Sequence, residues 1–145
     1  LASENDIKSF SMTGQRRDLN REKFKLDNLL SRLNNPESNA NKNLKYLRNA
    51  MDVRSELKQF HPCSEMKCLS KGRSDIVVIK RSKGTESVFA IHNMTENKIN
   101  YQLNDNDLPK IIDNDFNTHD FLTSTKYNCK NISLDPFQVI WLSAL

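Results

Sequence analysis

The chain has 145 residues, enough for one ordinary domain or for a small domain with an appendage. Hydrophobic residues make up 37% of the chain and charged residues 28%, so its apolar share is lean for a globule that stands alone. The sequence has no run of about 18 apolar residues and no basic start followed by an apolar run, so we predict neither a membrane-spanning helix nor a signal peptide.

The net charge of +4 arises in the first part of the chain. Residues 1–59 hold 12 Lys and Arg against 8 Asp and Glu, whereas residues 60–145 hold 10 of each kind. The charges of the first part alternate in sign along predicted helices and form no block. This pattern is typical of a solvated helix face rather than of a nucleic-acid surface, so we expect no nucleic acid and no membrane as partner.

The chain is predicted to start with a loop and a first helix. Residues 1–23 show no sustained period and contain the pair Thr13-Gly14, so we expect a long loop there. Apolar residues then recur at helical spacing, which predicts a helix that ends at Asn34. Its apolar positions are Phe24, Leu26, Leu29, Leu30 and Leu33.

A second helix is predicted directly afterwards. Asn35 is expected to cap it and Pro36 to occupy its first position, where a missing N–H group is tolerated. His61-Pro62 is expected to end it. Its apolar face consists of Leu44, Leu47, Met51 and Leu57, at spacings typical of a helix.

Short strands are predicted after Pro62. The segment 75–95 contains two strands around a turn at Lys83-Gly84, and the segment 98–103 alternates between apolar and polar residues. Helices followed by strands, without alternation of the two, argue for two different units with a boundary near Pro62. We therefore expect an α+β chain whose second part is a small antiparallel β-sandwich of six or seven strands.

The last strand is predicted to start at Pro136, and it is apolar on both faces. Phe137, Val139 and Trp141 share one face, while Ile140 and Leu142 share the other. A small sandwich covers only one of these faces. We therefore expect another part of a larger structure to cover the second face.

The order of several short motifs resembles the sucrose phosphorylase-like enzymes of the α-amylase superfamily, including the glucosylglycerate phosphorylase branch. That family carries an N-D stretch, a T-G turn and an R-D-I-N-R sequence after the eighth barrel strand. The first matches here are Asn5-Asp6, Thr13-Gly14 and the segment 17–21, in which Leu replaces the usual Ile. Further matches are "FHP" at 60–62, "IHNMT" at 91–95 and the closing "LDPFQVIWL" at 134–142. The resemblance extends over nearly the whole chain.

The resemblance implies a (β/α)8 barrel followed by an all-β C-terminal domain. Residues 1–61 would then be the end of the catalytic barrel, with the loop after strand eight and two helices, and residues 62–145 the C-terminal domain. A chain that opens at Leu1, in the middle of this pattern, is expected to be the C-terminal fragment of a longer enzyme. The missing barrel would cover the second face of the last strand and the apolar faces of both helices.

The same resemblance implies a function for the intact parent. It would be a retaining glycosyltransferase that takes sucrose, phosphorylated sucrose or glucosylglycerate with phosphate and releases glucose 1-phosphate. Retention needs two carboxylates about 5–5.5 Å apart. In the family these acids belong to barrel strands upstream of Leu1, so we assign no catalytic residue here and expect the fragment alone to be inactive.

Three residues of this chain are candidates for contact with substrate. Arg21 matches the family arginine that reaches the bottom of the glucose pocket, and a guanidinium suits hydroxyls and a carboxylate together. The alternative is a loop arginine that pairs with Asp18 or Glu22. Asn5 and Asp6 belong to the same loop, and their alternative role is that of turn formers.

No cofactor and no metal is expected. His61, Cys63 and Cys68 lie close together in the sequence, but their spacing fits no standard zinc pattern. The cysteines, which also include Cys129, are odd in number, and this favours reduced thiols and a cytoplasmic location.

Two other functional classes stay open from the sequence alone. One is a freestanding carbohydrate-binding β module, which would need exposed, coplanar aromatic side chains, whereas Phe89, Tyr101, Phe137 and Trp141 are predicted to lie on buried strand faces. The other is an interaction domain that holds a partner on the apolar face of its second helix.

Overall fold

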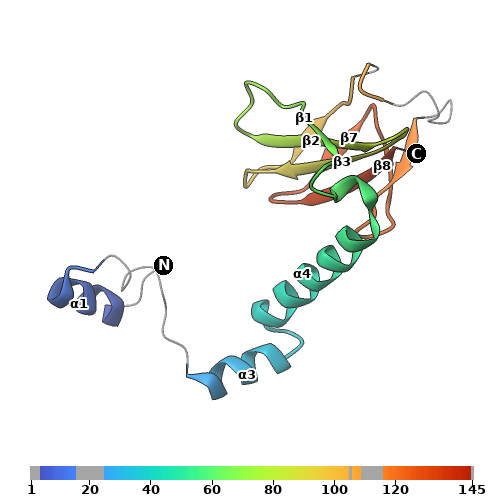
Figure 1. Cartoon of the computed structure of the whole chain (residues 1–145). Helices are drawn as coiled ribbons and strands as arrows, with labels where there is room; N and C mark the ends of the chain where they lie inside the picture. The colour runs from blue at the N-terminus through green and yellow to red at the C-terminus, as the bar shows by residue number, and fades with distance from the viewer. Residues whose placement is uncertain (1–3, 16–24, 105, 109–115, 145) are drawn as a thin grey trace. The chain divides into compact units, whose positions relative to one another are not determined.

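The computed structural model describes residues 4–15, 25–104, 106–108 and 116–144. The chain divides within helix α4 into two compact units, residues 1–47 and residues 48–145. Helices come first and antiparallel sheets follow, as the α+β prediction required (Figure 1). Among the described helices, none is long and apolar enough to cross a membrane.

Helix α1 (Glu4–Thr13) lies where the sequence analysis expected a loop. That prediction is wrong for these residues. Ile7 and Phe10 are spaced by three, and Gly14 ends the helix with a positive φ of 67°. The Gly14 N–H group donates to the Phe10 carbonyl oxygen at 2.7 Å, which is the glycine C-cap of an α-helix. The pair Thr13-Gly14 therefore ends a helix and does not belong to a long loop.

Helices α3 (Leu26–Asn34) and α4 (Asn39–Glu56) confirm the two predicted helices within the described residues. The predicted cap is wrong, because Ser38 caps α4 instead of Asn35. The Ser38 hydroxyl oxygen accepts the Asn41 N–H at 3.0 Å. Asn35 accepts the Glu37 N–H at 3.0 Å and so forms a turn around Pro36 that separates the two helices.

The second unit contains a short 3-10 helix and eight described strands. The 3-10 helix η1 (Lys58–Phe60) follows α4 and replaces the simple helix end expected at His61-Pro62. The strands are β1 (Glu65–Cys68), β2 (Ile76–Lys83), β3 (Glu86–Asn93), β4 (Ile99–Tyr101), β5 (Asn117–His119), β6 (Lys126–Asn128), β7 (Ile132–Leu134) and β8 (Val139–Ala144). Three of these, β1, β5 and β6, were not predicted.

The strands form one larger sheet and two small ones, all antiparallel. The larger sheet has the order β1-β2-β3-β8, while β4 pairs with β7 and β5 pairs with β6. The predicted hairpin is confirmed, but Lys83 still belongs to β2 and pairs with Glu86, so the turn lies at residues 84–85, one position later than predicted. Gly84 at this turn has a φ of 63°, which glycine adopts readily.

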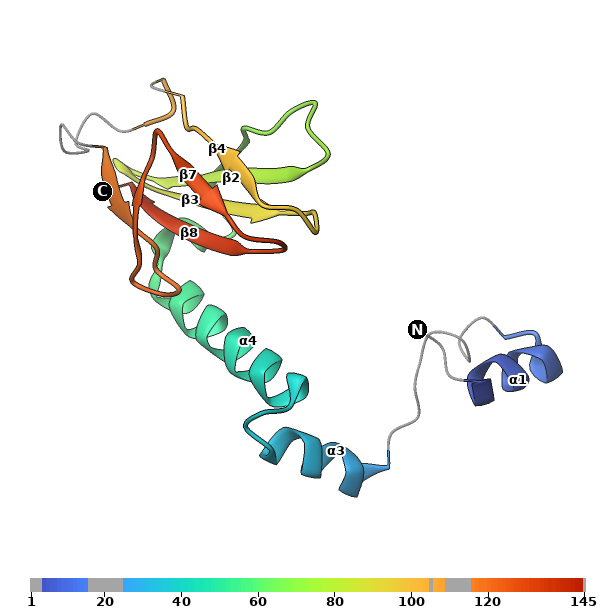
Figure 2. The ribbon, with the colours of Figure 1, turned by 180° about the vertical axis from the view of Figure 1, so that it is seen from behind.

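The hydrophobic core lies between the larger sheet and the β4–β7 pair, which stands in front of β2, β3 and β8 in Figure 2. This arrangement confirms a two-layered antiparallel β domain, with more strands than expected. Ile99, Tyr101 and Leu103 face the core, as their alternation predicted. The fully packed core residues are Ile76, Val78, Phe89, Ile91, Leu103, Cys129, Ile132, Leu134, Ile140 and Leu142.

The final strand starts at Val139, so the predicted start at Pro136 is wrong. Phe137 has a φ of 55° and is 65% exposed, and it belongs to the turn before β8 rather than to a strand face. Three hydrogen bonds hold the turn: Phe137 N–H donates to Thr95 O at 3.0 Å, Asp135 N–H donates to Gln138 Oε1 at 2.8 Å, and Gln138 N–H donates to Asp135 O at 3.1 Å.

Asp120 is fully buried and joins the loop after β5 to β8. Its Oδ1 accepts the N–H groups of Trp141 at 2.7 Å and Leu122 at 3.2 Å, and its Oδ2 accepts the Thr123 hydroxyl at 2.7 Å. A buried carboxylate with three donors fixes the backbone here, where β8 is paired on that side by an isolated antiparallel bridge between Asp120 and Leu142 and by the Phe121 N–H bond to Trp141 O.

Replacing Asp120 by Ala should lower the free energy of unfolding by about 2–3 kcal/mol, because the buried Trp141 N–H group loses its acceptor. Urea denaturation followed by circular dichroism measures this. Asp52→Ala, a change at an exposed helix position, is the control and should alter stability by at most about 0.5 kcal/mol. Equal losses for the two variants would contradict the assigned role of Asp120.

Candidate functional site

The structure leaves the predicted substrate-binding residues untested. Arg21 lies in the segment 16–24, outside the described residues. Asn5 and Asp6 lie in helix α1, and their side chains are likewise outside the described part. Their proposed contact with substrate therefore stays a prediction.

The most distinctive surface of the second unit is the side of the larger sheet that faces away from the core. We call it the outer sheet face. Strand register places its side chains in rows that cross β2, β3 and β8. Its apolar part consists of Val77, Ile79, Val88, Ala90, Val139 and Trp141, and His92, Arg81 and Ser143 lie in the same rows. An apolar patch of this kind is too large to be left fully to solvent.

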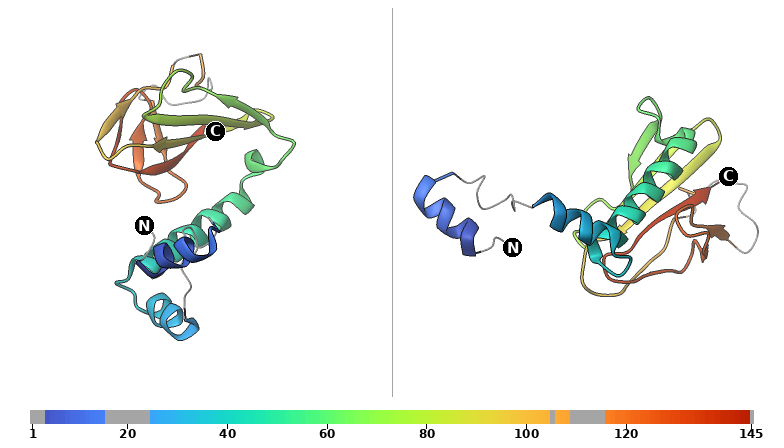
Figure 3. Two further views of the ribbon diagram at one scale, coloured as in Figure 1. Left: turned by 90° about the vertical axis from the view of Figure 1, so that its left-hand side faces the viewer. Right: turned by 90° about the horizontal axis from the view of Figure 1, so that it is seen from below.

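The 3-10 helix η1 covers one part of the outer sheet face. The Phe60 ring packs on the Trp141 ring with a centroid separation of 4.7 Å and an interplanar angle of 45°. Val88 and Ala90 are buried beneath this segment, at 1% and 7% exposure. Figure 3 follows the chain from the end of α4 through η1 to the sheet. Phe60 therefore covers the Trp141 side chain of β8 on this side of the sheet.

Polar contacts fix η1 to the β2–β3 hairpin. The Arg81 guanidinium donates to the carbonyl oxygens of Gln59 at 3.0 Å and His61 at 2.7 Å. The buried Gln59 side chain donates through Nε2 to Glu86 Oε2 at 2.8 Å. These bonds satisfy backbone carbonyl groups at the end of the α4–η1 segment, and they hold Phe60 in place over Trp141.

The rest of the outer sheet face is open among the described residues. Val139 is 40% exposed, and Met66 on the neighbouring β1 is 64% exposed. The Trp141 indole Nε1 is buried but has no hydrogen-bond acceptor in the described part of the chain. Exposed apolar side chains beside an unsatisfied donor are features of a surface that packs against a further structure.

His92 lies in the same surface, in register with Val77 and Val139. Burial lowers the pKa of this histidine from its ordinary value, because desolvation disfavours the charged imidazolium. The side chain is thus held in its neutral form on an apolar face, and it is not arranged as a catalytic base.

The helices present a second apolar surface. Within the described side chains, neither α3 nor α4 has a buried residue. On α4 the exposed positions Leu47 and Met51 are spaced by four, at 59% and 60% exposure, and Leu30 of α3 is 46% exposed. An amphipathic helix gains most of its stability from packing such a stripe, so these faces require a partner.

The structure offers no metal centre in its described part, where no three His, Cys, Asp or Glu side chains gather closely enough to hold an ion. Cys63 and Cys68 are exposed and form no disulfide, and Cys129 is buried in the core. The amide of Asn93 is buried: it donates to the carbonyl oxygens of Asn97 and Asp135 and accepts from Thr95. Its role is therefore structural.

Sequence reasoning found part of this arrangement. It predicted that the Val139 and Trp141 face would need cover, but it did not identify Phe60 as the residue that provides it. The aromatic residue before His61-Pro62 was visible, but nothing in its local sequence says that it folds back onto a strand 81 positions later.

No protein-family model and no curated protein matches this sequence. Solved structures share its fold. Trehalulose synthase MutB from Pseudomonas mesoacidophila matches over 79% of this chain and 19% of its own, with 13% identity and a TM-score of 0.59. Trehalose-6-phosphate hydrolase TreA from Bacillus licheniformis matches over 80% of this chain and 20% of its own, with 19% identity and a TM-score of 0.54.

An Anoxybacillus α-amylase also shares the fold. It matches over 75% of this chain and 23% of its own, with 14% identity and a TM-score of 0.58. The structural neighbours are thus α-amylase-type enzymes that act on glucosides, and this chain spans about a fifth of their length. At this level of identity the likeness shows a shared fold.

Lowering the pH from about 7.5 to 5 should reduce the free energy of unfolding, with the loss starting near the ordinary histidine pKa of 6.5. The unfolded chain binds a proton at His92 in this range, and the folded chain resists it, because its pKa is lowered. Denaturant titrations at several pH values measure the effect. His92→Gln should flatten the pH dependence. An unchanged slope in His92→Gln would refute this role.

The purified chain should associate with itself, because the apolar stripes of α3 and α4 are exposed. Light scattering at increasing concentration should show particles larger than the monomer mass of 16.8 kDa. The double variant Leu47→Gln with Met51→Gln should reduce this association, while Lys45→Gln should leave it unchanged. A stable monomer at high concentration would instead favour a freestanding module.

Proposed function

We propose that this chain is the C-terminal portion of a retaining, α-glucosyl-transferring sugar phosphorylase. It would comprise the end of the catalytic barrel and the all-β domain, divided near residue 61. The intact parent would take sucrose, phosphorylated sucrose or glucosylglycerate with phosphate and release glucose 1-phosphate in the cytoplasm.

The observation that carries this proposal is the shared fold with α-amylase-type enzymes over more than two thirds of the chain. The coarse class rests on that fold, and a fold by itself does not define a reaction. The finer choice of a phosphorylase rests on the ordered motifs at Asn5-Asp6, Thr13-Gly14 and 17–21, together with the closing segment 134–142.

The open apolar surfaces support the same proposal. A barrel packed on the stripes of α3 and α4 would bury Leu30, Leu47 and Met51, which are exposed in the described structure. A neighbouring surface at the outer sheet face would cover Val139. Both expectations follow from the general rule that large exposed apolar patches do not persist on monomers.

The role of this chain in catalysis would be to complete the substrate pocket. The two carboxylates that retention needs would come from the barrel. Arg21 would bind the glucosyl group by a two-pronged contact and pair with a barrel acid, and Asn5 and Asp6 would belong to the same wall of the pocket. The described residues would supply the scaffold.

The alternative is a freestanding carbohydrate-binding or helix-mediated interaction module. For sugar binding, two of the four aromatic residues considered are already used: Phe89 is fully buried, and Trp141 packs on Phe60. The exposed α4 stripe is compatible with an interaction module, and the experiments below separate it from an enzyme fragment.

The chain alone should release no glucose 1-phosphate from sucrose or glucosylglycerate and phosphate, because it contributes no pair of catalytic carboxylates. A longer polypeptide that joins this chain to the barrel encoded before it should show phosphate-dependent release. In that longer protein, Arg21→Lys should lower kcat/KM by about ten- to a hundredfold, because Lys cannot form the planar two-pronged contact.

The control is Arg16→Lys, which should change kcat/KM by less than about twofold because Arg16 has no match in the motif. Equal losses for the two variants would reduce Arg21 to a loop residue. A preceding reading frame without a barrel would refute the proposal as a whole.

A further inference from the structure

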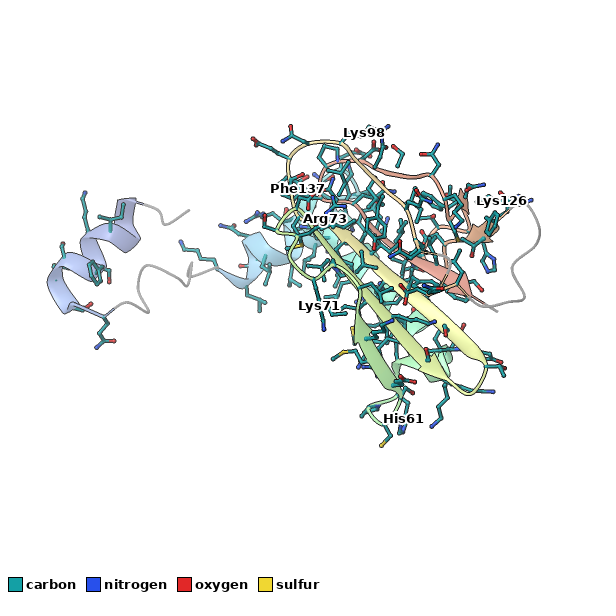
Figure 4. The ribbon with its side chains drawn as sticks, turned by 90° about the horizontal axis from the view of Figure 1, so that it is seen from above. His61, Lys71, Arg73, Lys98, Lys126 and Phe137 are labelled. Atoms are coloured by element: carbon teal, nitrogen blue, oxygen red, sulfur yellow. The ribbon has the colours of Figure 1, made fainter. Side chains whose placement is uncertain are left out.

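A groove of about 630 Å³ lies within the second unit, between the last turns of α4, helix η1 and the end of β2. We call it the basic groove. Its size lies in the range of small-molecule sites, about 300–1,000 Å³. Figure 4 labels His61 at this end of the larger sheet, while Lys71 and Arg73 lie at the other end.

Four cationic or protonatable side chains from different segments line the basic groove. Arg54 comes from the last turn of α4, Lys58 from η1, His61 from the segment after it, and Lys83 from the end of β2. Glu56 is the one acid among the lining residues. Positive charge therefore gathers at a concave surface, where its field is focused.

These cations are not neutralised by ion pairs within the described part of the chain, where the four ion pairs involve Lys42, Lys67, Arg73 and Lys98 instead. Glu86 lies opposite Lys83 in the hairpin register, but its Oε2 accepts from Gln59 Nε2. The charge of the basic groove is thus available to an outside anion.

The end of α4 accounts for only some of this charge. The C-terminus of a helix carries a partial negative charge that favours nearby cations, which gives a structural reason for Arg54 and Lys58. His61 and Lys83 do not belong to α4: His61 follows η1 in the sequence, and Lys83 is the last residue of β2. Their convergence on the same groove needs a further reason.

The lining of the basic groove also has an apolar part. It consists of Met51, Leu57 and Phe60, and we call it the apolar floor; Met51 is 60% exposed. A groove lined by both apolar and cationic side chains fits a ligand that has an apolar body and an anionic group, because each part of the ligand then meets a matching part of the lining.

We infer that the basic groove binds an organic phosphate, with its phosphate group on Arg54, Lys58 and Lys83 and its apolar body on the Met51, Leu57 and Phe60 floor. A guanidinium binds two phosphate oxygens at once, and lysine ammonium groups act as point charges. This site is separate from the proposed glucosyl pocket, and its occupation does not depend on the proposed enzymatic function.

Phenyl phosphate is a suitable probe, because it combines a phosphate dianion with an apolar ring. Trp141 is the single tryptophan and contacts Phe60, which lines the basic groove, so its fluorescence should report binding. Titration of the full chain at low ionic strength should give saturation. Phenyl phosphate should bind at least about fivefold more tightly than inorganic phosphate, because only phenyl phosphate also covers the apolar floor.

Lys58→Gln and Lys83→Gln should each weaken binding of phenyl phosphate about five- to tenfold, since each removes one charge-assisted contact. Lys71→Gln, at the other end of the sheet, is the matched control and should change the Kd less than about twofold. The absence of saturable binding, equal affinity for inorganic phosphate, or an equal effect of the control would each overturn the inference. Circular dichroism of each variant checks that it is folded.

Discussion

Strand β8 carries apolar side chains on both faces. The β4–β7 pair covers one face, and Phe60 covers part of the other. Ile140 and Leu142 are fully buried on the core side, where the β4–β7 pair closes the sandwich. Val139 and Trp141 face the other way, where the described residues form no second sheet. An edge strand of this kind is a site for unwanted pairing unless another element protects it. The Asp120 carboxylate, bonded to the Trp141 N–H group, occupies part of that edge.

The connection between α4 and the sheet supplies the missing cover. Helix α4 ends at Glu56, Leu57 has an extended backbone, and the 3-10 turn of η1 then brings Phe60 onto the Trp141 ring. The position is fixed by Arg81, which donates to two carbonyl oxygens of this segment. Packing of Phe60 thus buries part of Trp141, and the Arg81 guanidinium orients the segment that carries Phe60. The cover is incomplete, because η1 is three residues long and leaves Val139 partly exposed.

Local sequence patterns predicted some of the elements whose causes are local. The spacing in α4 and the turn signal at Gly84 predicted a helix and a hairpin correctly, whereas α1 was missed although its spacing and its glycine cap are local. The strands β1, β5 and β6 were missed, because they are three or four residues long and depend on pairing partners rather than on their own pattern. The start of β8 was wrong because Phe137 adopts a positive φ, which bulky residues rarely do. Of the candidate site, the need for cover was predictable, but the basic groove was not, since its cations come from separate segments.

Phe60 connects the two surfaces on which the functional arguments rest. One part of its environment is the Trp141 ring on the outer sheet face, and another is the floor of the basic groove. A ring in contact with both cannot move for one without a change at the other, because interiors at native packing density transmit displacement. If a structure docked on the outer sheet face and a ligand in the basic groove favoured different positions of Phe60, each would change the affinity of the other by the same factor. The η1 helix would then be the element that couples the two proposed sites.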